Sequence, residues 1–340
     1  MPTIPPTSGA WVVDHAALGE YSPDCLRWEE RPVTAPDGGV LVRTILLSID
    51  PTTRNWLTLD RSKQFIPFGV GDVMIGSALG VVHVSDHPGF REGDIVTGLW
   101  GWSEYAAADP ALLERHDDDA IPDEAFLSVF SHIGRAAAIG LLEIAALRPG
   151  DVVVVSGAAG ATGSLAVQIA AARGHRVVAI AGGAEKCAYA RSIGADAAID
   201  HRSDDVAARL REECPDGIDV YFDNLGGATL DAVLATMAVG CRIALCGAMS
   251  QYDLADPDDA YGVKNLPQLL WHRARIQGYV VPDYAARYAE FDRVLLDLWR
   301  SGALTARADM LDGLQSAPEA VSRNLDGRNR GKLMVRVSGR

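Results

Sequence analysis

A glycine-rich segment at 157–163 carries the most specific chemical signal in this chain of 340 residues. It follows an apolar run at 152–155 and precedes a segment at 163–173 whose composition suits a helix. Glycines allow a sharp turn and a close approach to a ligand, and the unpaired N–H groups of a helix start bind phosphate. The alternative is a tight strand-to-helix turn without a ligand. The residues expected to bind a dinucleotide pyrophosphate are Gly160, Ala161, Thr162 and Gly163.

The end of the next expected strand, at 177–180, indicates which dinucleotide binds. A carboxylate there would accept hydrogen bonds from the free 2′-hydroxyl of NAD and repel the 2′-phosphate of NADP. The sequence instead continues Ala-Gly-Gly-Ala-Glu-Lys, which leaves room and places the cation of Lys186 just beyond. One charge-assisted contact, worth about 1.5–3 kcal/mol, favours NADPH over NADH by roughly one to two decades. The alternative for Lys186 is a solvated lysine at a helix start, paired with Glu185.

Metal ligands are sparse in the sequence, and we expect no metal site. No Cys-x-x-Cys pair occurs among the five cysteines, which excludes the usual thiolate zinc site. Cys241 and Cys246 are expected on one strand, where their spacing places them on opposite faces. His83 and His87 have a spacing that suits a helix, but the sequence around them indicates a strand followed by a turn.

Charge and cysteine content exclude several classes of function. The chain has 31 Lys and Arg residues against 45 Asp and Glu residues, and its net charge of −14 repels nucleic-acid phosphates and acidic membranes. Scattered cysteines indicate free thiols in a reducing compartment, so we expect a cytoplasmic protein. The first ten residues lack the basic and apolar stretches of a secretory signal. The uncharged segment 152–172 contains glycines and Gln168, which favour a strand, a turn and a buried helix over a membrane span.

The distribution of apolar runs predicts two domains. Runs at 40–48 and 80–84, with frequent turn residues, indicate a β-rich domain in the first third. From residue 151, strand-like runs alternate with helical segments at intervals of roughly 20–25 residues, as in a doubly wound parallel sheet. A last strand at 331–337 is expected to return to the N-terminal sheet. The strand-like runs are 152–155, 177–180, 197–199, 218–222, 241–245 and 276–281, and the expected helices include 163–173 and 184–193.

Several short motifs occur in order along the chain. They are Asp50–Arg54, Ala158–Ser164, Ala181–Lys186, Tyr221–Gly227, Cys246–Tyr252, Ala274–Val281 and Asn329–Lys332. Together they resemble the successive motifs of the zinc-free medium-chain dehydrogenases/reductases, in the branch of prostaglandin, 2-alkenal and curcumin reductases. The resemblance runs from about Leu46 to Val337. Zinc-binding relatives carry Gly-His-Glu near the segment that here reads Ile-Gly-Ser-Ala-Leu-Gly, at 75–80.

The resemblance implies an α/β fold that combines a Rossmann doubly wound parallel sheet with a discontinuous β-rich GroES-like domain. The substrate domain would comprise 1–123 and 304–340, and the NADPH-binding domain 124–303. The implied reaction is the metal-independent, NADPH-dependent reduction of the carbon–carbon double bond of α,β-unsaturated ketones or aldehydes, by hydride transfer to the β-carbon. Relatives are commonly homodimers paired through the last Rossmann strand, here at 276–281. An NADPH quinone oxidoreductase and a sensor or storage protein that binds NADPH without turnover are the alternatives.

The resemblance also assigns cofactor contacts to individual residues. His201 stands where relatives often have a tyrosine near the 2′-phosphate, and the charge of a histidine varies with pH. The segment 131–138 replaces a stretch that in the family usually contains Gly, Thr and an aromatic residue, so we expect substrate or nicotinamide contacts there to differ. The assigned contacts are Gly160, Ala161, Thr162, Gly163, Lys186, His201, Asn224, Cys246, Gly247, Ala248, Met249, Ser250, Tyr252, Tyr279, Val280, Val281 and Asn329.

A few polar side chains are candidates for the chemistry itself. Reduction of an enone places negative charge on the carbonyl oxygen, and the α-carbon needs a proton. The phenol of Tyr252, with an ordinary pKa of about 10, either positions the nicotinamide ribose, donates that proton or is structural. Asn224 follows a buried strand and either contacts the ligand or caps its own Gly-Gly turn. Asp50 and Arg54 either border the substrate cleft or form an ion pair that holds a turn. Aromatic residues expected mostly in the core or an interface are Trp56, Phe65, Phe68, Trp100 and Tyr261.

Overall fold

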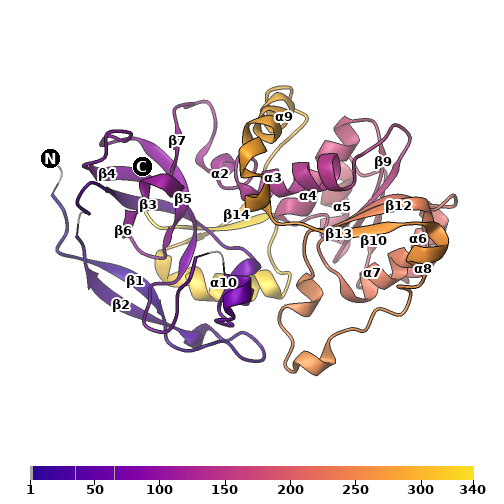
Figure 1. The fold of residues 1–340 in the computed structure, drawn as a ribbon, viewed down its shortest axis with the longest axis horizontal. Coiled ribbons are helices and arrows are strands. Elements are labelled where there is room, and N and C mark those ends of the chain that lie inside the picture. Colours follow the sequence, from indigo (N-terminus) through magenta and orange to yellow (C-terminus); the bar gives the residue numbers. More distant parts are fainter. Residues whose placement is uncertain (1–2, 35, 65) are drawn as a thin grey trace. The chain divides into compact units, whose positions relative to one another are not determined.

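The computed structural model describes residues 3–34, 36–64 and 66–340. The chain divides into two compact units, one formed by 1–127 together with 308–340 and the other by 128–307. The first unit is therefore built from two segments that the whole second unit separates in the sequence. In Figure 1 these segments are the indigo-to-purple and the yellow ends of the colour scale.

The first unit is a mixed β structure. A large sheet has the strand order β14-β15-β3-β4-β5-β7, with β6 paired to β3, and a separate antiparallel pair is formed by β1 and β2. The sequence of β3 is mostly apolar, and the strand is buried along nearly its whole length, as is typical of a central strand. The strands are β1 Thr7–Val13, β2 Leu26–Pro32, β3 Val40–Ser48, β4 Ile75–Ser85, β5 Ile95–Gly101, β6 Tyr105–Ala108, β7 Glu114–His116, β14 Ala308–Asp312 and β15 Lys332–Arg336, and the helices are α1 Thr52–Trp56, α2 Asp123–Phe126 and α10 Ala317–Leu325.

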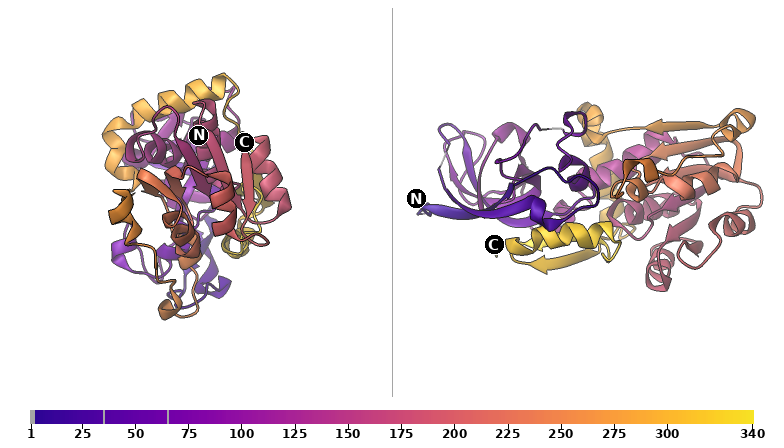
Figure 2. Two further views of the ribbon diagram at one scale, coloured as in Figure 1. Left: turned by 90° about the vertical axis from the view of Figure 1, so that its right-hand side faces the viewer. Right: turned by 90° about the horizontal axis from the view of Figure 1, so that it is seen from below.

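The end of the chain completes the N-terminal sheet. Strand β15 pairs antiparallel with β3, with Met334 opposite Ser48 and Arg336 opposite Leu46. Helix α10, yellow in Figure 2, lies beside the strands of this unit and contacts β15. The predicted return of the last strand to the N-terminal sheet is therefore confirmed.

The second unit is a doubly wound α/β structure. Its six strands have the order β10-β9-β8-β11-β12-β13, and every neighbouring pair is parallel. This order reverses direction between β8 and β11, the point where open α/β sheets bind ligands. The predicted fold class is confirmed. The strands are β8 Val152–Ser156, β9 Arg176–Ala181, β10 Ala197–Asp200, β11 Ile218–Asp223, β12 Met237–Leu245 and β13 Arg275–Gly278, and the helices are α3 His132–Ile139, α4 Ala161–Ala172, α5 Ala184–Ser192, α6 Val206–Glu213, α7 Gly227–Leu234, α8 Gln268–His272 and α9 Tyr288–Arg300.

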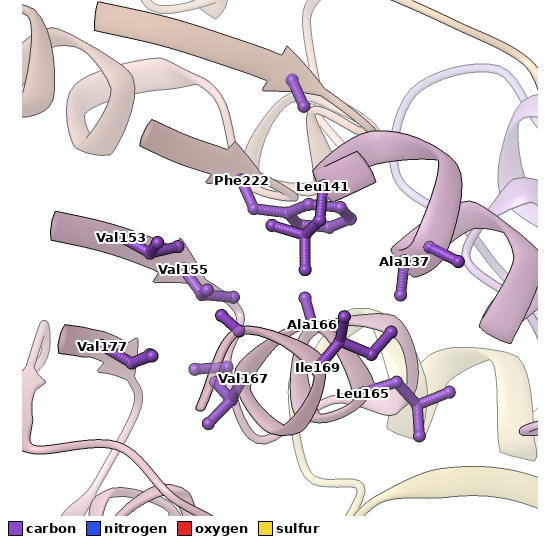
Figure 3. Close-up of a cluster of buried hydrophobic side chains, with 14 of the residues drawn as sticks. Ala137, Leu141, Val153, Val155, Leu165, Ala166, Val167, Ile169, Val177 and Phe222 are labelled. Atoms are coloured by element: carbon purple, nitrogen blue, oxygen red, sulfur yellow. The ribbon is translucent and has the colours of Figure 1, made fainter. Parts of the chain in front are cut away.

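Alternate side chains of the parallel strands enter two different cores. Val153 and Val155 of β8 pack with α3 and α4 on one face, whereas Val154 packs with α6 and α7 on the other. Figure 3 shows the first of these cores, where Phe222 and Leu141 meet the apolar side of α4. Because both faces of the central strands are covered, β8 is apolar apart from its last residue and β9 is apolar after its first. This pattern made these strands recognisable in the sequence.

Several boundaries differ from those expected, and three of them lie near the expected cofactor contacts. Helix α4 begins at Ala161 rather than at residue 163, because the chain is already helical in the glycine-rich segment. Strand β13 ends at Gly278 rather than at residue 281, and a 3₁₀-helix with Pro282 in its first turn begins at Val281. Strand β12 ends at Leu245, so the placement of Cys246 on the same strand as the preceding cysteine is wrong.

The structure also places the uncharged segment 152–172. Its first part is β8, a turn follows, and the rest is α4, which is the arrangement expected from the sequence. Within the part of the chain that the structure describes, no helix has the length and apolar character needed to cross a membrane.

Candidate cofactor site

The first glycine-rich turn joins β8 to α4. Gly157 has a φ of +59°, a left-handed conformation that glycine adopts without strain. Gly160 is the N-cap of α4, and Ala161, Thr162 and Gly163 form its first turn. The first N–H groups of a helix have no intrahelical partner and carry the positive end of the helix dipole. The four residues expected to bind pyrophosphate therefore lie together at a helix N-terminus, where a diphosphate is stabilised.

Close packing of this turn requires a glycine at 163. A Cβ atom there would clash with the carbonyl oxygen of Gly157 and would lie 3.0 Å from the Cα of Ala158. Ala158 in turn donates its N–H to the carbonyl oxygen of Ile180, at 3.1 Å, and so ties the turn to the end of β9. The turn is therefore too tight to hold a side chain at position 163.

A second turn follows β9 and leads into α5. Lys186 lies in the first turn of α5, after the N-cap Gly183. A cation at a helix N-terminus opposes the helix dipole, so Lys186 does not serve the stability of this helix. The carboxylate of Glu185 lies 3.3 Å from the guanidinium of Arg307. Glu185, the acid that the sequence offered as a partner for Lys186, therefore also interacts with Arg307.

Two basic residues that follow β10 reach the same turn. His201 donates its N–H to the carbonyl oxygen of Ala181 at 3.0 Å. A Cβ atom at Gly182 would lie 2.8 Å from Nε2 of His201 and 3.0 Å from Nε of Arg202. The pKa of His201 is lowered, first by desolvation and then by the charges of Arg202 and Lys186. Three basic side chains thus face one small region at the ends of β9 and β10.

Asp200, the last residue of β10, lies beside these basic residues. Its Oδ1 atom accepts the N–H of Gly183 at 2.8 Å and the N–H of Arg202 at 3.0 Å. These hydrogen bonds lower the pKa of Asp200. The carboxylate therefore fixes the two loops that carry the basic side chains.

Asn224 follows β11 and reaches across to β8. Its Nδ2 donates to the carbonyl oxygen of Ser156 at 2.6 Å, and its backbone N–H donates to Oγ of Ser156 at 3.0 Å. The N–H groups of Leu225 and Gly226 are bound instead by Oδ1 of Asp223, both at 2.9 Å. Asp223, rather than Asn224, therefore caps the turn.

The loop after β12 is fastened to the loop after β11. The N–H groups of Cys246 and Gly247 donate to the carbonyl oxygen of Asp223, at 2.9 and 3.0 Å. Met249 donates its N–H to the carbonyl oxygen of Asn224 at 3.0 Å. The structure thus brings together two groups of expected contacts that lie more than twenty residues apart in the sequence.

Tyr252 closes the loop that follows β12. Its hydroxyl oxygen accepts the N–H of Ala248 at 3.1 Å. A Cβ atom at Gly247 would lie 3.3 Å from that same oxygen. The phenol is therefore held against the backbone of its own loop, on the side of the sheet where Asn224 lies.

Tyr279, Val280 and Val281 follow β13 instead of belonging to it. The hydroxyl of Tyr279 donates to the carbonyl oxygen of Ala136 in α3, at 2.7 Å. Burial raises the pKa of this phenol well above its ordinary value. The hydroxyl is thus engaged inside the unit, and a cofactor contact at 279–281 would use the main chain or the exposed Val280 side chain.

In the first unit, Asn329 is buried and donates from Nδ2 to the carbonyl oxygen of Gly331, at 2.9 Å. Asp50 forms an ion pair with the buried Lys332, whose Nζ lies 3.0 Å from Oδ1. The guanidinium of Arg54 is buried and donates to a backbone carbonyl oxygen in the loop after β1. These contacts favour a structural role for both Asp50 and Arg54 over the lining of a substrate cleft.

Potential metal ligands are dispersed. All five cysteines are free thiols, and burial raises the pKa of Cys246 to about 11. His83 lies on β4, and its Nε2 is 3.2 Å from the carbonyl oxygen of Thr3. Among the residues the structure describes, no three His, Cys, Asp or Glu side chains are grouped as a metal site would need.

The aromatic residues expected in the core divide as follows. Trp56, Phe68 and Trp100 are buried in the core of the first unit. The hydroxyl of Tyr261 donates to Asp231 at 2.9 Å within the second unit. Phe65 lies outside the described residues.

Two family models match the chain. A model described as the N-terminal domain of oxidoreductase matches residues 10–115, and one described as zinc-binding dehydrogenase matches 161–298. The NADPH-dependent curcumin reductase of Escherichia coli (strain K12) is 36% identical over 336 residues, which cover 97% of this chain and 96% of that protein. The NADP-dependent 2-alkenal reductase of Nicotiana tabacum is 36% identical over 309 residues, 89% of each chain.

A solved structure is similar over nearly the whole chain. The crystal structure of CurA from Vibrio vulnificus in complex with NADPH has a TM-score of 0.90 at 33% sequence identity, and covers 98% of this chain and 100% of that one. The fold and the site define a two-domain dehydrogenase/reductase with a Rossmann unit. The chain belongs to the medium-chain dehydrogenase/reductase family, in the branch that contains the curcumin, 2-alkenal and prostaglandin reductases.

Three residues of the site were not singled out in the sequence. Arg202 joins Lys186 and His201, and Ser156 and Asp223 fasten the loops beside the first turn. A basic residue directly after His201 was a visible signal for Arg202. No comparable signal marked Ser156, because only the parallel pairing of β8 and β11 shows that these two strand ends are neighbours.

Proposed function

We propose that this chain is an NADPH-dependent ene-reductase that reduces the carbon–carbon double bond of small or medium α,β-unsaturated ketones and aldehydes. NADP(H) is its cofactor, bound by a Rossmann domain at 124–303, and 1–123 with 304–340 form the substrate domain. The observation that carries the proposal is the tight glycine turn at the start of α4, together with the three basic side chains of Lys186, His201 and Arg202 at the ends of β9 and β10. The chain also resembles an NADPH-dependent curcumin reductase over nearly its full length, which supports the same conclusion.

The residues of this chain hold the cofactor at three points. The first turn of α4 binds the diphosphate, and Lys186, His201 and Arg202 bind the 2′-phosphate through charge. Asn224 and the loop after β12 orient the nicotinamide half at the switch point of the sheet. When bound, NADPH supplies the hydride that adds to the β-carbon of the enone. The other proposed contacts are Gly160, Ala161, Thr162, Gly163, Cys246, Gly247, Ala248, Met249, Ser250, Tyr252, Tyr279, Val280, Val281 and Asn329.

Tyr252 is the catalytic candidate among the residues of the second unit. Its hydroxyl oxygen accepts the N–H of Ala248, which fixes the ring at the carboxyl edge of the sheet. From there the phenol orients the nicotinamide ribose or delivers a proton to the α-carbon. Tyr252→Phe separates these roles. A loss in kcat without a change in the NADPH dissociation constant indicates proton delivery, and a loss in affinity indicates orientation.

A substrate panel tests the reaction. Purified protein with NADPH is given enones and enals of increasing length, together with benzoquinone, and the products are identified by mass. We expect saturated ketones or aldehydes that are two mass units heavier than the substrates, with stoichiometric NADPH oxidation. Faster turnover of benzoquinone than of every enone would support a quinone reductase. Binding of NADPH without oxidation across the panel would support a sensor or storage protein.

The reaction is proposed to be metal-independent. The sequence carries no Cys-x-x-Cys pair and lacks the Gly-His-Glu motif of zinc-binding relatives. We therefore predict that exhaustive treatment with a chelator leaves the activity unchanged. Metal analysis of the treated protein would verify that no metal remains. Activity that falls on chelation and returns with added zinc would contradict this.

We also propose a cytoplasmic homodimer. Strand β13 ends the parallel sheet, so its outer edge can pair with a second copy. Helix α8, which contacts β12, exposes Leu270 and Trp271, at 72% and 69% of their surface. Exposed apolar residues beside an open sheet edge are typical of an interface. Light scattering coupled to size-exclusion chromatography should give twice the mass of the chain, and a monomer would contradict the proposal.

A further inference from the structure

Asp223 makes an unusual set of contacts for a residue at a strand end. It is fully buried at the carboxyl end of β11. One oxygen atom, Oδ1, accepts four hydrogen bonds, from the hydroxyls of Tyr221 at 2.7 Å and Ser156 at 3.1 Å and from the N–H groups of Leu225 and Gly226. A single carboxylate oxygen thus joins the end of β8, the end of β11 and the turn that follows β11.

The main chain of Asp223 extends this connection to a third segment. Its carbonyl oxygen accepts the N–H groups of Cys246 and Gly247, which begin the loop after β12. Ser156, which donates to the Asp223 carboxylate, also accepts the N–H of Asn224. The residue therefore fixes both loops that are proposed to hold the nicotinamide half of the cofactor.

The burial of this carboxylate is costly to the fold. Burial raises the pKa of Asp223, because desolvation outweighs the hydrogen bonds that favour its ionised form. Its Oδ2 atom is buried without a hydrogen-bond partner among the described residues. Asp219 at the other end of β11 also bridges to β8, since its Oδ2 accepts the N–H of Val152 at 2.9 Å, but it is only partly buried. Pairing of the two strands therefore does not require a fully buried carboxylate.

We propose that Asp223 is a positioning residue for the nicotinamide half of NADPH. It acts through Asn224 and the loop after β12, and it does not itself touch the reacting atoms. The inference rests on the proposed cofactor contacts of those two loops. Its consequence is a selective one: loss of the Asp223 carboxylate should disturb the nicotinamide end of the bound dinucleotide and leave the adenosine end, which binds at β9 and β10, unaffected.

The test compares Asp223→Asn with Asp219→Asn, the same change at opposite ends of one strand. Two probes are used, NADPH and adenosine 2′,5′-bisphosphate, which lacks both the diphosphate and the nicotinamide. Loss of charge assistance in four hydrogen bonds should raise the dissociation constant of NADPH about tenfold or more in Asp223→Asn. The bisphosphate should bind within about twofold of the parent protein. Asp219→Asn should bind both probes as the parent does. The fluorescence of bound NADPH, which reports the surroundings of the nicotinamide, should change only in Asp223→Asn.

Equal losses for both probes in Asp223→Asn, or no loss for either, would overturn the proposal. If this variant does not fold, Ser156→Ala decides by the same comparison, because it removes one donor to the carboxylate and the acceptor of the Asn224 N–H. A protein that binds NADPH yet reduces no enone would refute the proposed reaction. The binding comparison would remain valid in that case, since it needs no substrate.

Discussion

The two turns that precede α4 and α5 are proposed to bind phosphate groups by different physical means. In the first, between Gly157 and Gly163, backbone N–H groups are presented by a turn too tight for a Cβ atom. In the second, Lys186 and Arg202 supply charge from their side chains, and His201 adds charge when its ring is protonated. The only steric constraint there is the close approach of Gly182 to His201 and Arg202. On this proposal, a diphosphate is recognised mainly by the shape of the turn, and a 2′-phosphate mainly by charge.

This difference has consequences for mutation, pH and salt. A steric site fails when one atom is added, and neither salt nor pH restores it. In a site made of exposed charges, each charge that is removed lowers the affinity for the phosphate by a part. The contribution of the remaining charges falls as ionic strength screens them. The first turn should therefore determine whether a dinucleotide binds at all, and the second which dinucleotide is preferred.

The largest effect is expected at Gly163. In Gly163→Ala the new Cβ atom would clash with the Gly157 carbonyl oxygen and crowd the Ala158 backbone. Overpacking against backbone should lower the free energy of unfolding by about 3 kcal/mol and weaken NADPH and NADH alike, by about 100-fold or more. Chemical denaturation and fluorescence titration with both dinucleotides measure these changes.

Gly160→Ala is the matched control in the same turn. Its Cβ atom would meet only the Gly157 carbonyl oxygen, at 3.2 Å, and its φ of −80° suits any residue. We expect a loss of less than about 1 kcal/mol in stability. An equal loss of stability in Gly160→Ala and Gly163→Ala would show that the close contact at Gly163 does not determine the shape of the turn.

The first turn was predictable from the sequence and the second only in part. Glycine spacing after an apolar strand is a local signal, and Gly160–Gly163 lie where the sequence placed them. Lys186 was also visible locally. Arg202 and the Asp223 network depend on which strands are neighbours, and the order β10-β9-β8-β11 is not encoded within any one segment. The sequence likewise gave no sign that the hydroxyl of Tyr279 binds the backbone of α3.

Lys186→Ala should separate the two dinucleotides. Removal of one charge-assisted contact to the 2′-phosphate costs about 1.5–3 kcal/mol, so NADPH should bind roughly 10- to 100-fold more weakly. NADH lacks this phosphate and should bind as before. Lys63→Ala, which removes an exposed lysine of the other unit, is the control. An equal loss for NADPH and NADH would contradict the assignment of the second turn to the 2′-phosphate.

His201 should make the NADPH preference depend on pH. Desolvation, Arg202 and Lys186 lower its pKa and Asp200 raises it, with a net shift below the ordinary value, so the ring is neutral in the free protein near pH 7. A bound 2′-phosphate favours the protonated ring. NADPH affinity relative to NADH should therefore rise severalfold as the pH falls from about 7.5 to about 6.

Two variants isolate the contribution of this ring. The affinity for NADPH relative to NADH depends on pH through His201 and through the 2′-phosphate, which also titrates. His201→Gln should remove the part that comes from the histidine ring. Arg202→Ala removes a charge that lowers the pKa of His201. The midpoint of the pH dependence of NADPH binding should therefore move to higher pH, while the affinity for NADPH falls at every pH. If the ratio of the two affinities follows the same pH curve in the parent protein and in His201→Gln, the ring does not contribute.

The smallest effect is expected at Glu185, which tests the charge-based description of the second turn. Its carboxylate is 55% exposed and pairs with Arg307 at 3.3 Å. Glu185→Gln removes a negative charge beside Lys186, and exposed charges of this kind interact by about 0.2–1 kcal/mol. NADPH should therefore bind more tightly, by no more than about fivefold, and NADH should be unchanged. Because the effect is electrostatic and exposed, it should disappear in about 1 M salt. A gain that persists in high salt would mean that the second turn, like the first, discriminates by shape.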